Sequence, residues 1–163
     1  PSLALIVSAM WLLPLPASAA CELDVAIKTT DGSKTRIVSQ GETIRTGQKI
    51  RIESRSQNGC YLLVFWKDSS GQVYNLTSEF EERRTGLYID RNSAYVLPSE
   101  KPWFQLDHVP GIEQIVVVGS PEEITRPDKI GISLAMQEKP IIPTWLSSSQ
   151  TLEVFSRALH HED

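Results

Sequence analysis

Short segments of alternating apolar and polar residues recur along the chain and predict half-buried β-strands. Residues 22–28 carry apolar side chains at every second position, and Lys49–Glu53 places two isoleucines on one side and charges on the other. A period of two is the pattern of a strand with one buried face. Thr35–Ser39 follows the turn signal Asp31-Gly32 and is expected to pair back onto the first of these strands.

Two further segments are apolar on both of their faces. Cys60–Trp66 is a continuous apolar run, and Ile112–Val118 is a second run, rich in β-branched residues. Runs of this length between turn signals are typical of interior strands that are covered on both sides. The hairpin signal Asn58-Gly59 predicts that the first run pairs with Lys49–Glu53, and Gln72–Leu76 is expected on its other side.

The whole pattern predicts a mainly β protein. Leu87–Ile89 and Ala94–Leu97 are shorter strand candidates, and Ile130–Met136 is another. Regular turn signals between short strands favour a single antiparallel β-sandwich, either immunoglobulin-like or a partly closed barrel. Residues 121–126 have room for one helical turn.

A short C-terminal helix is expected at the end of the chain. Ser147 followed by Gln150 is a capping-box pattern. Leu152, Phe155 and Leu159 then fall on one helical face.

Residues 1–20 carry no charge and predict a secretory signal peptide, truncated at its start. Leu3–Leu13 is an apolar core, followed by helix-breaking prolines and small residues. The alternative, a buried N-terminal helix, is disfavoured because Pro14 and Pro16 would break it. Residues 21–163 then form a single β-rich domain, and the protein is expected to be exported to the periplasm or secreted.

The two cysteines, Cys21 and Cys60, have several open fates. An even pair in an oxidising compartment favours a disulfide. Alternatively, Cys60 is a small core residue and Cys21 is free, or Cys21 carries a lipid that anchors the protein to the outer membrane. Export without an anchor is favoured, because Ser18 stands where lipoprotein signals usually carry an aliphatic residue.

The charge of the chain argues against a nucleic-acid partner. Its formal net charge is −4, and no basic patch of the kind that a phosphate backbone requires is present in the sequence. The densest charge run, residues 79–84, mixes both signs and is expected to be a solvated loop.

About half of the chain, residues 41–120, resembles a bacterial family of domains of unknown function, DUF4384. The matching positions are Gly47, Ile50, Ile52, Cys60–Phe65, Asp68, Gly71, Val73, Leu76, Leu97, Pro98, Phe104, Pro110, Gly111, Glu113 and Ser120. The sequence departs from the family at Thr77-Ser78, where members usually carry Phe-Pro. The resemblance implies a β-rich accessory module, found in other proteins beside kinases or caspase-like peptidases, with no catalytic residue to carry over.

Three segments contain residue types used in catalysis or metal binding, but none predicts a catalytic or metal site. Asp107-His108 lacks a nucleophile motif, and adjacent residues in an extended segment point to opposite faces. His160–Asp163 is expected to be a frayed tail with adventitious metal affinity at most. Asp68–Gly71 lacks the ligand spacing of a calcium loop and is expected to be a turn. We therefore expect no cofactor and no enzymatic activity.

The expected function is that of an exported, non-enzymatic accessory or protein-interaction module of the bacterial envelope. Its partners are expected to be envelope proteins, with membrane contact only if Cys21 is lipidated. The alternative is a carbohydrate- or small-ligand-binding sandwich that uses exposed aromatic side chains. Trp103 and Trp145 are the candidates for such contacts, because both lie outside the strongest strands.

Overall fold

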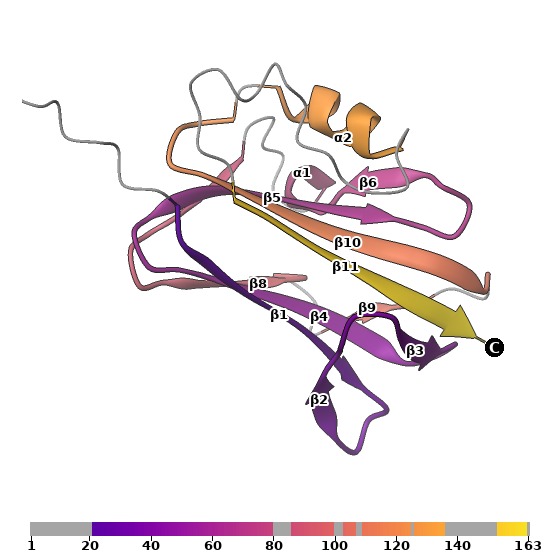
Figure 1. Cartoon of the computed structure of the whole chain (residues 1–163). Coiled ribbons are helices and arrows are strands. Elements are labelled where there is room, and N and C mark those ends of the chain that lie inside the picture. Colours follow the sequence, from indigo (N-terminus) through magenta and orange to yellow (C-terminus); the bar gives the residue numbers. More distant parts are fainter. Residues whose placement is uncertain are drawn as a thin grey trace, which may run out of the picture.

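Two β-sheets packed face to face form the body of the protein (Figure 1). The structure, a computed structural model, describes residues 21–79, 86–99, 103–106, 109–124, 126–135 and 153–162. The prediction of a mainly β sandwich is confirmed, and the described strands form two separate sheets rather than a closed barrel. The predicted signal segment 1–20, the capping box and Trp145 lie outside the described residues. No helix among the described residues is long and apolar enough to cross a membrane.

Sheet A has five strands, in the order β2-β1-β4-β8, and β9 pairs with β4 beyond the end of β8. Its strands are β1 (Leu23–Thr30), β2 (Thr35–Ile37), β4 (Lys49–Ser56), β8 (Ala94–Leu97) and β9 (Phe104–Gln105). The predicted return of the chain after Asp31-Gly32 is confirmed, because β2 pairs antiparallel with β1.

Sheet B has six strands, in the order β3-β11-β10-β5-β6, and β7 also pairs with β5. Its strands are β3 (Glu42–Arg45), β5 (Cys60–Lys67), β6 (Val73–Asn75), β7 (Leu87–Ile89), β10 (Gly111–Ser120) and β11 (Glu153–Glu162). The two segments predicted to be interior strands are β5 and β10, and they lie side by side in an antiparallel pair.

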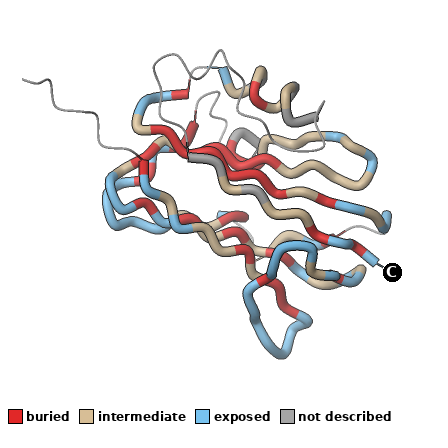
Figure 2. The backbone as a smooth tube through the Cα atoms, viewed as in Figure 1, coloured by how far each residue is buried: buried red, intermediate tan, exposed pale blue. Residues whose placement is uncertain are grey.

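The main core lies between the two sheets. Alternate residues of β5 and β10, such as Leu62, Val64 and Ile115, point into it and meet Ile27 and Ile52 of sheet A. Figure 2 shows the buried positions concentrated along these central strands. The predicted inward orientation of the isoleucines in Lys49–Glu53 is confirmed.

A second, smaller apolar cluster covers the outer face of sheet B. Leu63 and Phe65 of β5 pack there with Ile130 of helix α2 (Pro127–Ala135). The prediction that β5 is covered on both faces is therefore confirmed, with a helix on one side. The expected strand at Ile130–Met136 is wrong: Pro127 stands in the first helical turn, where its missing N–H costs no hydrogen bond.

A second short helix, α1 (Leu76–Glu79), follows β6 at the point where the sequence departs from the family that it resembles. The Asn75 side-chain oxygen accepts hydrogen bonds from the Thr77 backbone nitrogen (3.2 Å) and hydroxyl (2.6 Å). This is N-capping by an asparagine. Thr77-Ser78 therefore continues the chain as a capped helical turn.

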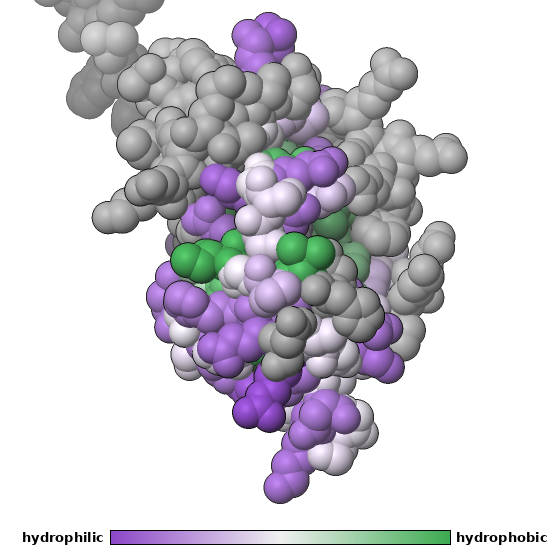
Figure 3. Space-filling view, turned by 90° about the vertical axis from the view of Figure 1, so that its right-hand side faces the viewer, coloured by the Kyte–Doolittle hydropathy of each residue, from purple (hydrophilic) through white to green (hydrophobic). Residues whose placement is uncertain are grey.

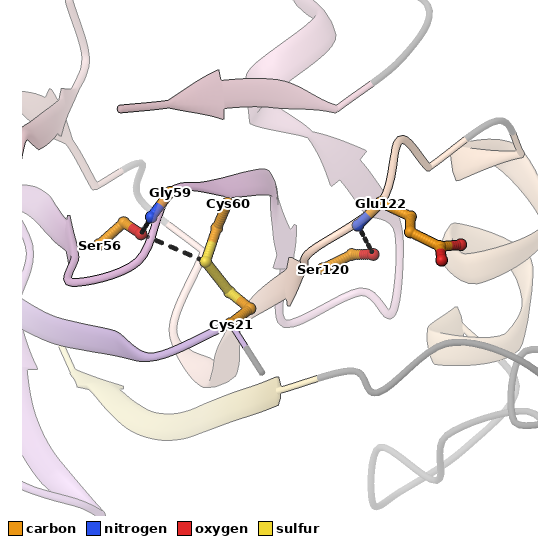
Figure 4. Close-up of a disulfide and its surroundings, with 6 residues drawn as sticks. All are labelled: Cys21, Ser56, Gly59, Cys60, Ser120 and Glu122. Carbon is orange, nitrogen blue, oxygen red and sulfur yellow. Dashed lines mark hydrogen bonds between the residues drawn. A yellow bond between two sulfur atoms is a disulfide. The ribbon is translucent and has the colours of Figure 1, made fainter. Parts of the chain in front are cut away.

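The predicted pairing of Lys49–Glu53 with Cys60–Trp66 is wrong. These segments are β4 and β5, and they lie in different sheets. The Ser56 hydroxyl accepts a hydrogen bond from the Gly59 nitrogen (2.9 Å) and donates one to Cys60 Sγ (3.2 Å), and Gly59 has a φ of 85° (Figure 4). The turn therefore carries the chain across the core, which lets the apolar faces of β4 and β5 meet.

The predicted C-terminal helix is also wrong, because Glu153–Glu162 forms strand β11. It pairs antiparallel with β10 and parallel with β3, so the sandwich is not wholly antiparallel. The Arg157 guanidinium donates a hydrogen bond to the Val38 carbonyl and lies over the Phe155 ring, 4.9 Å from its centroid. These contacts join the last strand to the segment between β2 and β3.

A disulfide between Cys21 and Cys60 joins the two sheets at one end (Figure 4). Cys21 lies two residues before the start of β1, and Cys60 is the first residue of β5. A Cβ on Gly119 would clash with Leu23 and lie 2.6 Å from Cys21 Sγ, so only glycine allows this close approach. The prediction of a disulfide is confirmed.

Reducing the disulfide is expected to lower the free energy of unfolding by about 4 kcal/mol. The bond closes a loop between residues 39 positions apart, and loop closure restricts the unfolded chain. Denaturant titration with and without reductant measures the change. The double variant Cys21→Ser/Cys60→Ser is the control and should match the reduced protein; equal midpoints in all three samples would contradict the expectation.

Candidate functional site

A carboxylate is buried inside the sandwich at the end opposite the disulfide. Glu113 lies on β10 and shares its inward face with Ile115 and Val117, and it is only 3 % exposed. A buried carboxylate is costly unless hydrogen bonds or opposite charges compensate it. The hydrogen-bond partners of the Glu113 carboxylate therefore determine whether this end of the molecule has a structural or a chemical role.

Glu113 contacts Trp66 and His161, and His161 in turn contacts Thr46; we call these four residues the Glu113 network. Trp66 Nε1 donates to Glu113 Oε2 (2.8 Å), and His161 Nδ1 lies 3.1 Å from Glu113 Oε1. The other ring nitrogen, His161 Nε2, lies 2.9 Å from Thr46 Oγ1. The network thus joins β5, β10, β11 and the turn after β3.

One assignment of protons satisfies all of these contacts. If the Thr46 hydroxyl donates to His161 Nε2, the neutral imidazole carries its proton on Nδ1 and donates it to Glu113. A hydroxyl bonded to an imidazole that is in turn bonded to a carboxylate is also the arrangement of a Ser-His-Asp catalytic triad. However, the side chains of His161 and Glu113 are only 1 % and 4 % exposed, so neither group is open to a substrate. We interpret the network as a polar clamp between strands.

The expectation of a frayed tail at His160–Asp163 is wrong for its described part, residues 160–162. These residues end strand β11, where His160 is exposed and His161 is buried. The signal that could have found the network is Glu113 itself, because the alternation of β10 places it on the apolar face. Asp107 and His108 lie outside the described residues. Within the described ranges, no group of three or more histidine, cysteine, aspartate or glutamate side chains could hold a metal ion.

The outer face of sheet A is a second candidate site, because both described helices lie on the sheet B side (Figure 1). Strand register arranges its outward side chains in rows that run across the strands. The first row contains Ile37, Lys28 and Arg51, and Trp103 lies beside Arg51. The second row contains Ala26, Glu53 and Val96, and the third contains Asp24, Arg55 and Ala94. The predicted outward orientation of the charges in Lys49–Glu53 is confirmed.

Ion pairs fix the centre of this outer face. Lys28 Nζ lies 2.6 Å from Glu53 Oε2, and Arg51 Nε lies 3.5 Å from Glu53 Oε1. The Arg51 guanidinium also lies 5.9 Å from the centroid of the half-buried Trp103 ring. Trp103, predicted as a contact residue, therefore stands at the border of a charged surface.

Beside the ion pairs the outer face is hollowed. An open depression of about 390 Å³ is lined by Asp24, Val25, Ala26, Glu53, Ser54, Arg55 and Ala94. Small-molecule sites generally begin at about 300 Å³. The depression exists because two alanines stand where longer side chains would fill the surface between the strands.

The end of the molecule where β10 begins presents little apolar surface. Figure 3 shows small hydrophobic spots within a largely hydrophilic surface. Val109 and Ile112, near the start of β10, are exposed. Single exposed apolar residues are common on folded proteins and do not by themselves mark a binding site.

Asp68–Gly71, which superficially resembles a calcium loop, forms a turn closed by its own hydrogen bonds. Asp68 Oδ1 accepts hydrogen bonds from the Ser70 nitrogen and hydroxyl and from the Gln72 nitrogen, at 2.6–2.9 Å. Partial burial raises the pKa of Asp68, but these donors together with the Tyr74 hydroxyl outweigh it and hold the pKa below its ordinary value. The expectation of a turn is confirmed.

Comparison with known proteins gives a family and nothing finer. Residues 43–123 match the model of a family described as "Domain of unknown function (DUF4384)". This range includes β4 to β10, and hence Glu113, Trp66, Trp103 and most of the outer face of sheet A. The comparisons with curated proteins and with solved structures gave no match.

Removing the imidazole of the Glu113 network should destabilise the protein strongly. His161→Ala leaves the Glu113 carboxylate and the Thr46 hydroxyl without this partner, and we expect a loss of about 3 kcal/mol. The neighbouring His160→Ala is the matched control and should stay within about 0.5 kcal/mol, because His160 is exposed. Urea denaturation of both variants makes the comparison; equal losses would rule out the clamp.

Acid should expose the contribution of Asp68. Because its pKa is lowered in the folded state, the ionised carboxylate stabilises the fold above its ordinary value of 3.8, and this stabilisation is lost as the pH falls below that value. Asp68→Asn keeps an accepting oxygen but cannot titrate. The difference in denaturation midpoint between pH values of about 5.5 and 3 should therefore be smaller in Asp68→Asn than in the original protein. An equal or larger difference would contradict this cause.

Proposed function

The chain belongs to the DUF4384 family, and on this premise we propose that it is an exported, non-catalytic module of the bacterial envelope that binds a partner protein through the outer face of sheet A. The observation that carries this proposal is the difference between the two outer faces. Helix α2 packs on that of sheet B, whereas sheet A presents fixed ion pairs, a tryptophan and a depression to solvent.

The buried disulfide supports the exported location. Cys21 and Cys60 are 4 % and 0 % exposed, and such bonds persist in oxidising compartments such as the periplasm. The bond also occupies the Cys21 sulfur that a lipid would require, which favours export without a lipid anchor. Residues 1–20 serve as the export signal in this proposal.

The closed state of the Glu113 network supports a non-catalytic role. Both ring nitrogens of His161 and both oxygens of Glu113 already have partners inside the protein. A general base must reach a substrate proton within hydrogen-bond distance, and the 1 % exposed imidazole is occupied by Thr46 on that side.

The charges of the outer face suit a polar, specific contact. Six charged residues lie on it, four basic and two acidic, although the whole chain carries a net charge of −4. The charged residues are Asp24, Lys28, Lys49, Arg51, Glu53 and Arg55. Fixed charges of both signs give a binding face specificity and direct the encounter with its partner.

Photo-crosslinking in the intact cell envelope tests the proposal. Benzoylphenylalanine in place of Ala94 or Gln105, on the outer face of sheet A, should capture the same protein from both positions. Glu122, exposed just after β10, is the matched control position and should capture none. Capture should also fall several-fold when Arg55→Glu is added.

Three outcomes would contradict this proposal. Equal capture from Glu122 would mean that sheet A has no special role. Absence of an adduct from both sheet A positions would mean that no protein occupies the face. An adduct whose mass falls on treatment with muramidase would favour the alternative, a carbohydrate-binding module in which Trp103 supplies the aromatic contact.

A further inference from the structure

We infer that the depression on the outer face of sheet A binds a short zwitterionic peptide, one that carries both a free carboxylate and a free ammonium group. The inference rests on the proposed function only in taking this face as the binding face, and it names the chemistry that the face recognises. Three features of the depression carry it: a couple of charges that are not paired with each other, two alanines that leave space between the longer side chains, and a size that fits such a ligand.

The unpaired couple consists of Asp24 and Arg55. The register places them directly opposite each other on β1 and β4, yet they form no ion pair with each other. The only hydrogen bond that the described structure gives the Asp24 side chain is a long one, 3.4 Å from Gln57 Nε2. Arg55 is exposed and has no ion-pair partner among the described residues. One cation and one anion are thus available at the rim.

The other charge at the rim is already neutralised. Glu53 pairs through Oε2 with Lys28 and through Oε1 with Arg51. The Glu53 carboxylate therefore lies toward Lys28 and Arg51 and away from Asp24 and Arg55. A ligand in the depression meets Asp24 and Arg55 as its strongest polar partners.

These two partners select for a ligand with both charges. A guanidinium binds a carboxylate through two parallel hydrogen bonds, but a simple anion would also meet the Asp24 carboxylate. A simple cation would likewise be repelled by Arg55. A peptide with free ends satisfies both groups at once, which is how charge arrangement gives specificity by rejecting incomplete ligands.

Ala26 and Ala94 leave the space for a ligand. Ala26 of β1 is opposite Glu53, and Ala94 of β8 is opposite Arg55, so a small side chain lies on each side of β4. A volume of about 390 Å³ is at the lower end of the range for small-molecule sites. The depression therefore suits a di- or tripeptide better than a larger ligand.

Titration of the ¹⁵N-labelled, oxidised protein with dialanine, followed by NMR, tests the inference. We expect saturable shifts of the amides of Ala26, Arg55 and Ala94 with a dissociation constant of about 1 mM, because exposed charge pairs each contribute little. N-acetyl-dialanine and dialanine amide, which each lack one charge, should bind about tenfold more weakly.

Variants make the test specific to the depression. Arg55→Gln and Asp24→Asn should each weaken dialanine binding about tenfold, and Ala94→Trp should abolish it by filling the space. Lys34→Gln, in the exposed turn between β1 and β2, is the matched control and should bind as the original protein does. Unchanged spectra away from the depression establish that each variant is folded.

Several results would overturn the inference. The first is the absence of saturable shifts, and the second is equal binding of the two blocked peptides. Shifts that depend on protein concentration alone would identify a second copy as the occupant, and shifts with chitin oligosaccharides instead of dialanine would identify a glycan. If crosslinking from Ala94 and Gln105 succeeds while dialanine fails, the face stands and only the ligand class is wrong.

Discussion

The rest of the structure depends on the two-sided burial of the antiparallel pair β5 and β10. Neither strand can present a face to water, because Leu62 and Val117 point to one side while Leu63 and Val116 point to the other. Sheet A must therefore cover one face and helix α2 the other. The hydrophobic effect of these two strands sets the layer order before any polar contact is made.

Two different bonds then close the opposite ends of the same strand. At the first residue of β5, the Cys60–Cys21 disulfide joins sheet B to the segment entering sheet A. Near its last residues, Trp66 donates to Glu113, which is also bonded to His161 of the final strand. Trp66 meets Phe104 of sheet A edge-on as well, with ring centroids 5.8 Å apart. The disulfide and the Trp66–Phe104 contact thus join the two sheets, whereas the hydrogen-bonded clamp joins the strands of sheet B.

In the part of the chain that the structure describes, this arrangement leaves the outer face of sheet A uncovered. The interior is committed to packing and the outer face of sheet B to α2, so the outer face of sheet A is where recognition is proposed. Its backbone is held by β1 and β4 over eight residue pairs, which gives its outward side chains a rigid support. Lys28, Arg51 and Glu53 hold one another in place there, whereas Asp24 and Arg55 do not. Side chains on a rigid sheet can recognise a ligand without the entropy cost of ordering a loop.

The sequence by itself determined the strands of the central sheets and their inward faces, because a period of two and long apolar runs are local properties of Lys49–Glu53, Cys60–Trp66 and Ile112–Val118. It also indicated the cysteine pair and the family. Only the tertiary structure decided which strands are neighbours. Asn58-Gly59 encodes a turn, but it does not encode whether the turn joins two strands of one sheet. Passage of the chain from sheet A to sheet B is favoured because it buries the apolar faces of β4 and β5 against each other.

The same limit explains the C-terminus and the Glu113 network. Leu152, Phe155 and Leu159 fit a helical spacing. In the strand, one face carries Phe155, Arg157, Leu159 and His161. Two of these four residues are polar, so the sequence does not show the apolar period of two that predicts a strand. Both side chains find partners far away in sequence: one Arg157 nitrogen donates to the Val38 carbonyl, and His161 Nδ1 pairs with Glu113. A local pattern cannot contain such partners, since long-range contacts alone bring them together.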